Sequence, residues 1–186
     1  MRPLFLRPLL IALLLLRCAF LSASELPVPV NVQLPLFQKI WKLDRSFTRH
    51  PSVIVAIVYQ ESYAESVQVK EQVSHWVDGK GRHLHTVAVA IDGTENVNAL
   101  KSIEADVFYI APLRAADIGA IAKIARSRHI RTNTGVPNYA EDGLGVAIDV
   151  RDDHPLIVIN LPASEAEGAS FPAQLLQLAR LIGVTR

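Results

Sequence analysis

Runs of hydrophobic residues alternate along this chain with segments whose hydrophobic residues recur every three or four positions. The continuous runs are rich in β-branched residues, which is typical of strands covered on both faces. They occur at residues 52–59, 84–91, 107–111 and 130–134. The helically spaced segments lie between them, at residues 63–77, 97–103 and 115–128. Strands that alternate with helices are joined by crossovers, so this part of the chain is predicted to form a mostly parallel sheet covered by helices on both faces.

The segment before the first strand predicts an amphipathic helix. From residue 36 to residue 47, Phe37, Ile40 and Trp41 fall on one side, and the lysines fall elsewhere. Trp41 is expected to be a core residue rather than a platform for a ligand. Residues 25–35 include Pro27 and Pro29 and are predicted to form an extended lead-in.

The C-terminal part of the chain predicts a hairpin followed by a closing helix. Two β-type runs, Leu144–Val150 and Leu156–Leu161, flank a polar connection at residues 152–155. Helical spacing follows, with Ser170 as the expected N-cap and with these apolar positions on one face: Phe171, Leu175, Leu178, Leu181 and Ile182. The predicted fold is therefore α/β, a mostly parallel sheet with a C-terminal antiparallel hairpin and a closing helix. Residues 36–186 are expected to form a single domain.

Residues 1–24 have the pattern of a cleavable export signal. Arg2 and Arg7 precede an apolar stretch, and small residues at positions 22–24 offer a cleavage site. Arg17 leaves the apolar stretch shorter than the roughly 20 residues that a membrane span needs. An uncleaved anchor and a lipid attached at Cys18 are the alternatives. After cleavage, no direct insertion into a membrane is expected.

Charge and cysteine content exclude several classes of protein. The export signal carries three of the 19 basic residues and none of the 18 acidic ones, so the rest of the chain has a net charge of about −2. Such a chain has no general attraction for nucleic acid or for anionic membranes. Cys18 is the only cysteine and lies within the signal, so the processed protein is predicted to contain no disulfide.

The residues that follow the predicted parallel strands are of interest, because open α/β sheets bind ligands at the carboxyl ends of their strands. The candidate ligand or partner edge consists of Tyr59, Gln60, Glu61, Asp92, Pro112, Asn133, Thr134 and Tyr139. The alternative interpretation is that these are helix caps and loop residues. Residues 135–143, which include Tyr139, are predicted to form a surface loop that takes part if a partner or ligand is recognised.

No residue pattern predicts catalysis, a metal site or a cofactor. His83 and His85 share one face of a strand, but no cysteine, HExxH motif or carboxylate cluster supplies the remaining metal ligands. The pair Gly143 and Gly145 lacks the third glycine of a dinucleotide-binding fingerprint. Residues 165 and 167 are glutamates two positions apart on a predicted helix, so they do not face each other as an acid and base pair. The sequence therefore predicts a protein that is not an enzyme.

Small and apolar residues of the C-terminal part follow a recognisable order. They are Gly143, Gly145, Asn160, Ala163, Gly168, Phe171, Leu175, Leu178 and Arg180, with Ile159-Asn160-Leu161 at the end of a strand. This order resembles the C-terminal half of the YfiR-like (YfiR/HmsC-type) periplasmic proteins. Residues 38–40 (Gln-Lys-Ile) and 44–45 (Asp-Arg) resemble the opening helix of one branch of that family. The resemblance covers most of the chain after the signal, and it implies structural roles for these residues.

The resemblance also implies a location and a function. YfiR-like proteins are periplasmic; they bind the periplasmic sensory domain of an inner-membrane diguanylate cyclase and hold the enzyme inactive, which lowers cyclic di-GMP and biofilm formation. A homodimer is possible on the same ground. Some members of the group carry cysteine pairs, which this chain lacks, so their redox regulation is not carried over. The α/β pattern with polar strand ends leaves an alternative, a single-lobe periplasmic protein that binds a small molecule.

Overall fold

The computed structural model describes residues 26–47, 52–79, 83–92 and 95–184, so the predicted export signal lies outside the described residues. The strands are β1 (Val53–Tyr59), β2 (Leu84–Ala90), β3 (Val107–Ile110), β4 (Arg131–Thr134), β5 (Val146–Arg151), β6 (His154–Asn160) and β7 (Arg180–Ile182). The helices are α2 (Val30–Leu43), α3 (Ala64–Asp78), the 3-10 helix η1 (Glu95–Lys101), α4 (Ile118–Ser127), α5 (Asn138–Glu141), α6 (Leu161–Ala166) and α7 (Ala173–Leu178).

The strands form one sheet in the order β2-β1-β3-β4-β5-β6-β7. All neighbours from β2 to β5 are parallel, β5 and β6 form an antiparallel hairpin, and β7 runs parallel to β6. The predicted α/β class, with its mostly parallel sheet and its C-terminal hairpin, is confirmed. The ladders differ in length, because β1 pairs with β2 along its whole length, whereas β4 and β5 pair only at Asn133 with Val146 and at Thr134 with Ala147.

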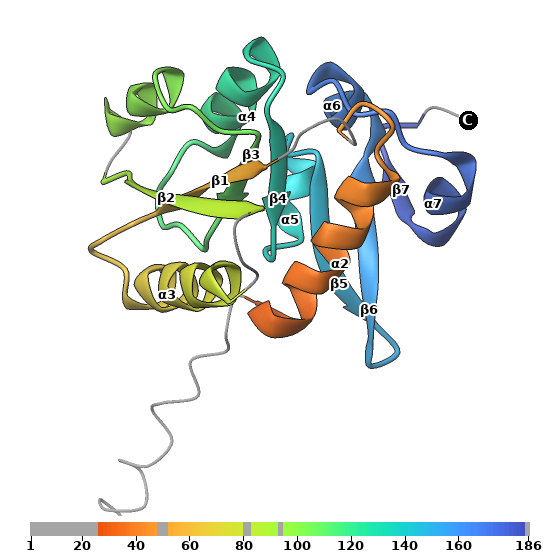
Figure 1. Cartoon of the computed structure of the whole chain (residues 1–186), viewed down its shortest axis with the longest axis horizontal. Helices are drawn as coiled ribbons and strands as arrows, with labels where there is room; N and C mark the ends of the chain where they lie inside the picture. Colours follow the sequence, from red (N-terminus) through yellow and green to blue (C-terminus); the bar gives the residue numbers. More distant parts are fainter. Residues whose placement is uncertain (1–25, 48–51, 80–82, 93–94, 185–186) are drawn as a thin grey trace, which may run out of the picture.

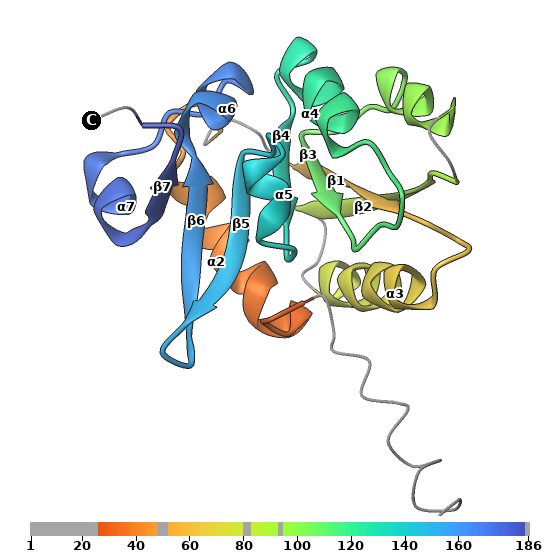
Figure 2. The same ribbon diagram turned by 180° about the vertical axis from the view of Figure 1, so that it is seen from behind.

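Side chains of β1 alternate between the two faces of the sheet. Val55 and Ile57 pack in one cluster with α2 and α3, whereas Ala56 and Val58 pack in another with η1 and α4. Helix α2 lies in front of β5 and β6 in Figure 1 and behind them in Figure 2. The predicted cover of helices on both faces is therefore confirmed.

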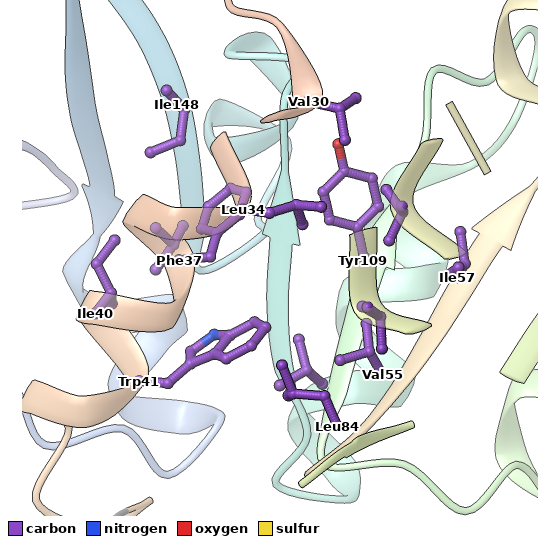
Figure 3. Packing of buried hydrophobic residues seen from close by; sticks show 14 of the residues in the cluster. Val30, Leu34, Phe37, Ile40, Trp41, Val55, Ile57, Leu84, Tyr109 and Ile148 are labelled. Carbon is purple, nitrogen blue, oxygen red and sulfur yellow. The ribbon is translucent and has the colours of Figure 1, made fainter. Parts of the chain in front are cut away.

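Helix α2 buries one side against the centre of the sheet. Phe37 is fully buried, and its ring meets the ring of Tyr109 edge to face, with the centroids 6.1 Å apart. Figure 3 shows Phe37 and Trp41 directed from α2 into the space beside Tyr109. Trp41 is buried as predicted, and its indole N–H donates to Oδ1 of Asn133 (2.8 Å).

The extended lead-in predicted for residues 25–35 is wrong beyond residue 29, because α2 begins at Val30. The carbonyl of Pro29 accepts the N–H groups of Val32 and Gln33 (2.9 and 3.1 Å), which satisfies donors of the first turn. The helix also ends at Leu43, four residues before the predicted end at residue 47.

The buried side chain of Gln33 explains why the helix starts early. Its amide nitrogen donates to the carbonyl of Val28 (2.5 Å), and its amide oxygen accepts from the hydroxyl of Tyr109 (2.9 Å). These contacts can form only when the first turn packs onto the sheet. Pro35 lies inside the helix, where it costs one backbone hydrogen bond, and the burial of the surrounding turns offsets that cost.

The predicted hairpin has a tight turn at its tip. Asp152 and Asp153 both have positive φ angles, 50° and 61°. Type I′ hairpin turns, whose twist matches that of the flanking strands, require positive φ at both central positions, and aspartate adopts this conformation more readily than most residues. The polar connection predicted at residues 152–155 is therefore the turn and the start of β6.

A closing helix follows Ser170 as predicted, but it is shorter than the apolar spacing indicated. Helix α7 spans only Ala173–Leu178, Pro172 rather than Ser170 is its N-cap, and the strand β7 follows. Leu175 is buried in the cluster that contains α2, whereas Leu178 is 73% exposed. The apolar positions at helical spacing thus belong to two different elements, α7 and β7. Strand β7 forms because the outer edge of β6 offers unpaired backbone groups.

Leu175 and Leu178 provide a matched test of this correction. Leu175→Ala is expected to lower the free energy of unfolding by roughly 2 kcal/mol, because it leaves a cavity beneath α7. Leu178→Ala is expected to change it by less than about 0.5 kcal/mol, since that side chain is mostly in solvent. Urea denaturation of the two variants measures both values. Equal losses would support a single closing helix instead.

Candidate functional site

The strand order of the sheet changes direction between β1 and β3, because β2 lies on one side of β1 and β3 lies on the other. The chain leaves β1 through α3 on one face of the sheet to reach β2, and it leaves β2 through η1 on the other face to reach β3. Open α/β sheets bind ligands where this change opens a crevice, beyond the carboxyl ends of the two strands. The carboxyl ends of β1 and β3 are therefore the expected place for a binding site.

A groove of about 870 Å³ lies at this place. One wall is the first three turns of α3, and the other is the segment 26–30 that leads into α2. Its volume is within the range of small-molecule sites, roughly 300–1,000 Å³. Its polar lining residues are Ser62, Glu65, Gln68, Gln72 and Arg114.

A second hollow of about 380 Å³ continues the groove along α3. Both hollows are lined by Pro29, Val30 and Gln72, and the second extends to His75 and Trp76. We call the two hollows together the α3 groove. Helix α3 has 15 residues and is therefore about 22 Å long, so the α3 groove is elongated rather than round.

Arg114 and Tyr63 determine the chemistry of one end of the α3 groove. The guanidinium group of Arg114 lies 4.0 Å from the centre of the Tyr63 ring, which holds the cation by its attraction to the aromatic face. The hydroxyl of Tyr63 donates to Oε2 of Glu65 (2.6 Å). An exposed cation beside apolar lining residues suits a partner segment or small molecule that has an apolar part and a carboxylate.

Part of the predicted edge braces the loops beside the α3 groove. Oε1 of Gln60 accepts from the backbone N–H of Arg114 (2.8 Å), which ties the loop after β1 to the loop after β3. Oδ1 of Asp92 accepts from the hydroxyl of Ser62 (3.1 Å), which ties the loops after β1 and β2. These residues support the loops that carry Tyr63 and Arg114.

Tyr59 and Glu61, also of the predicted edge, lie at the exposed end of β1. The hydroxyl of Tyr59 donates to Oε1 of Glu61 (3.1 Å), and the ammonium group of Lys70 lies 5.2 Å from the centre of the Tyr59 ring. Partial burial, with a contribution from the Glu61 carboxylate, raises the pKa of Tyr59 above its usual value.

The other four residues of the predicted edge are buried: Pro112, Asn133, Thr134 and Tyr139. The hydroxyl of Thr134 donates to the carbonyl of Ile110 (2.9 Å). The hydroxyl of Tyr139 accepts from the N–H of Leu113 and donates to its carbonyl (2.9 and 3.0 Å). The surface loop predicted at 135–143 is wrong in this respect, because it contains α5 with Tyr139 and Ala140 in the interior. Four residues of the predicted edge therefore lie at the exposed ends of β1 and β2, and the other four are buried and have structural roles.

A buried ionic network, which the sequence interpretation missed, lies where the C-terminal end of α2 meets the start of β4. Asp44 is only 1% exposed, and its Oδ1 accepts the N–H groups of Ser46 and Ser170 (3.0 and 2.9 Å). Its Oδ2 accepts from Nε of Arg131 (3.2 Å). Arg131 also donates to the carbonyl of Gly168 (2.9 Å). We call these five residues the Asp44–Arg131 network, and it connects segments far apart in the sequence.

Glu167 is a second buried acidic residue that the sequence interpretation missed. Its carboxyl group accepts the N–H and the hydroxyl of Thr132 (2.9 and 2.6 Å), at the end of the short ladder between β4 and β5. The Thr132 hydroxyl in turn accepts the N–H of Gly145 (2.6 Å). Burial raises the pKa of Glu167 to about 7, although Thr132 and the charges of Arg126 and Arg131 oppose that rise. Glu167 thus completes the junction between the two strands.

Gly145 owes its identity to this junction. A Cβ atom at position 145 would overlap Oε2 of Glu167 and lie 3.0 Å from the Ser164 hydroxyl. Gly143 and Gly168 instead have positive φ angles, 109° and 87°, which side chains rarely adopt. Gly145 therefore has a steric reason to be glycine, and Gly143 and Gly168 have a conformational one.

Asn160 and Arg180 also connect the C-terminal elements to the rest of the domain. Oδ1 of Asn160 accepts from the N–H of Ala163 (3.1 Å) and caps α6, while its amide nitrogen donates to the carbonyl of Ala140 (2.8 Å). Arg180 forms ion pairs with Glu141 (3.4 Å) and Asp149 (3.6 Å). Ala163 is buried and Phe171 packs against the α2 cluster.

Two classes of feature are absent from the part of the chain that the structure describes. No three His, Cys, Asp or Glu side chains within residues 26–47, 52–79, 83–92 and 95–184 converge as metal ligands would. Over the same ranges, no helix has the length and hydrophobicity needed to cross a membrane.

Comparison with known proteins gives a family and a fold. A model of the YfiR/HmsC-like family matches residues 46–180. No curated protein matches the sequence. A crystal structure of a conserved domain protein from Vibrio cholerae O1 biovar eltor superposes with a TM-score of 0.63 at 17% identity, covering 82% of this chain and 60% of that one. An ABC domain from Streptococcus pneumonia, crystallised in complex with L-Trp, superposes with a TM-score of 0.61 at 14% identity, covering 78% of this chain and 61% of that one. This chain thus spans less than two thirds of either structure.

Proposed function

Because the chain belongs to the YfiR/HmsC-like family, a family of periplasmic regulators, we propose that it binds the periplasmic sensory domain of an inner-membrane diguanylate cyclase and represses that enzyme. The match of the family model over residues 46–180 is the observation that carries this proposal. When the contact is released, cyclic di-GMP rises in the cytoplasm and biofilm formation increases. The protein itself has no catalytic role in this proposal.

Repression of this kind requires the regulator to distinguish two states of the cyclase. A ligand with equal affinity for the active and inactive states does not shift the equilibrium between them, however tightly it binds. Moving the cyclase from 99% active to 99% inactive takes an affinity difference of about 10⁴-fold between the two states. The regulator therefore needs a surface that fits only the inactive sensory domain.

We assign that surface to the α3 groove. It is elongated, it lies at the switch point of the sheet, and it combines apolar lining residues with the amide groups of Gln68 and Gln72. Arg114 at one end offers a cation to an acidic side chain of the partner. Specificity for one state follows if the matching partner segment is accessible only in the inactive sensory domain.

The experiment is deletion of the gene in the native host, followed by complementation. Deletion is expected to raise cyclic di-GMP, and the parent chain is expected to restore the original level. Arg114→Glu is expected to fail, because it reverses the charge in the α3 groove. Arg151→Glu is the matched control, since Arg151 is also exposed but lies at the hairpin tip. An unchanged cyclic di-GMP level after deletion would rule out the cyclase as partner.

A second candidate function is the binding of a small molecule by a single periplasmic lobe, and the volume of the α3 groove supports it. The processed chain is screened by thermal shift against amino acids and other small carboxylates. L-Trp comes first, because a domain of similar fold was crystallised with it. A ligand at 100 times its dissociation constant stabilises by about 2.7 kcal/mol. A shift that Arg114→Ala abolishes would favour this candidate, and an empty screen would weaken it.

A further inference from the structure

Arg114 is held in the α3 groove by an aromatic ring and not by hydrogen bonds of its side chain. Its guanidinium group lies 4.0 Å from the centre of the Tyr63 ring, and Tyr63 is only 8% exposed. A guanidinium group has five N–H donors. Among the described residues, no atom accepts a hydrogen bond from these donors and no carboxylate pairs with the group. The donors of Arg114 are therefore available to a molecule that enters the groove.

Four other arginines use their side-chain donors within the protein. Arg126 donates to one backbone carbonyl (3.0 Å), and Arg128 donates to two (2.7 and 2.6 Å). Arg131 and Arg180 pair with carboxylates. These side chains connect segments of the fold, whereas the side chain of Arg114 binds no acceptor in the part of the fold that is described.

The backbone beside Arg114 is also fixed. The N–H of Arg114 donates to Oε1 of Gln60 (2.8 Å), and the N–H of Leu113 donates to the hydroxyl of Tyr139 (2.9 Å). Ala115 has a φ angle of 53°, in the left-handed region that residues other than glycine rarely adopt. Such a conformation persists only where its surroundings enforce it. The loop therefore holds Arg114 in one place before a partner binds.

We propose that Arg114 is a preorganised receptor for a carboxylate of the partner, bound through two parallel hydrogen bonds, and that Gln60, Tyr63 and Ala115 position it. A guanidinium fork matches the two oxygens of a carboxylate, whereas an ammonium group is only a point charge. A side chain that is already fixed loses little conformational entropy on binding. This inference rests on the proposed function, because it names the group of the sensory domain that the α3 groove recognises.

The charges of the α3 groove favour a carboxylate over a phosphate group. Arg114 and Glu65 are the charged residues that line its larger hollow. The hydroxyl of Tyr63 donates to Oε2 of Glu65, so this carboxylate stays close to the ring that holds Arg114. A phosphate group carries nearly two negative charges, and Glu65 would repel it more strongly than a carboxylate. The expected contact is therefore an aspartate or glutamate side chain of the sensory domain.

Arg114→Lys separates the shape of this group from its charge. The variant keeps a cation in the α3 groove but loses the fork, so we expect the partner to bind about tenfold more weakly. In the complementation experiment, Arg114→Lys is expected to leave cyclic di-GMP above the parent level. Arg151→Lys, the matched control at the exposed hairpin tip, is expected to restore the parent level.

Side-chain dynamics test the positioning residues without a partner. NMR relaxation of the Nε–H group of Arg114 in the processed chain is expected to give an order parameter of about 0.8. Tyr63→Leu and Gln60→Ala are each expected to lower it below about 0.6. Tyr63→Phe keeps the ring and Gln60→Glu keeps the acceptor oxygen, so both are expected to preserve the parent value. Circular dichroism checks that each variant is folded.

Ala115→Gly tests the strained position. Glycine adopts positive φ without strain, so the variant is expected to raise the melting temperature by about 2 °C. The wider conformational range of glycine is also expected to loosen Arg114 and to weaken repression. Asp153→Gly, at a φ angle of 61° in the hairpin turn, is the matched control. It is expected to raise the melting temperature similarly and to repress as well as the parent.

Three results would overturn this inference. They are full repression by Arg114→Lys, a mobile Arg114 side chain in the parent, and equal repression by Ala115→Gly and Asp153→Gly. An unchanged cyclic di-GMP level after deletion would instead contradict the proposed function, and the relaxation of Arg114 would still support or refute the fixed side chain.

Discussion

Asp44→Ala is expected to lower the free energy of unfolding by about 3 to 5 kcal/mol, because removing one partner of a buried ion pair leaves the other charge uncompensated. The Arg131 side chain is only 14% exposed and loses its carboxylate. The backbone N–H groups of Ser46 and Ser170 lose their acceptor as well. Urea denaturation followed by circular dichroism measures the loss.

Two further variants show whether the loss comes from the Asp44–Arg131 network. Asp44→Asn keeps an oxygen for the backbone donors but removes the charge, so its loss is expected to be smaller than that of Asp44→Ala. Asp142→Ala is the matched control at an exposed position, and we expect it to change stability by less than about 0.5 kcal/mol. If Asp44→Ala were no more harmful than Asp142→Ala, the network would not stabilise the fold.

The stability of the protein is expected to fall by about 3 kcal/mol as the pH rises from 4.5 to 7, through the ionisation of Glu167 alone. Burial raises the pKa of Glu167 to about 7 in the folded chain, against 4.5 for an ordinary glutamate. Below pH 4.5 the group is protonated in both states and has no effect. Between the two values the unfolded chain ionises first, so each pH unit favours unfolding. Above pH 7 both states are ionised, and the loss is complete.

Glu167→Gln isolates this contribution from that of the other titratable groups. Glutamine has the same shape; its oxygen can accept the N–H of Thr132, and its amide can donate to the Thr132 hydroxyl. The difference in unfolding free energy between parent and variant, measured at half-unit steps from pH 4 to pH 8, is expected to change with pH in this window. A constant difference would mean that Glu167 has an ordinary pKa in the folded protein.

Periodicity predicted most of the fold, because the strands and long helices are defined by local patterns of burial. The run at 52–59 became β1, and the spacing of Val69, Val73 and Val77 became the inner face of α3. Elements held by distant contacts were predicted poorly. The first turn of α2 depends on Gln33 and Tyr109, which lie 76 residues apart, and β7 depends on an edge that β6 provides.

The candidate site was predicted in part, for a related reason. The rule that sites lie at the carboxyl ends of strands led to Tyr59, Gln60, Glu61 and Asp92, which lie at the exposed ends of β1 and β2. The same rule cannot tell an exposed strand end from a covered one, so it also selected Asn133 and Thr134, which are buried. The α3 groove was missed because its second wall is the segment 26–30, whose position depends on the packing of α2. Asp44 and Glu167 were missed because a buried acid has no local sequence signal.

The packing of α2 has a consequence for the order in which the protein can fold. This helix precedes every strand in the chain, yet its buried side chains share a cluster with Ile148 and Ile159 of the last hairpin. The apolar side of α2 can therefore be covered completely only after residues up to Ile159 have been synthesised. Contacts between residues so distant in sequence slow folding and leave apolar surface exposed in the meantime. A chain that ends before β6 would therefore leave part of the apolar side of α2 without its packing partners.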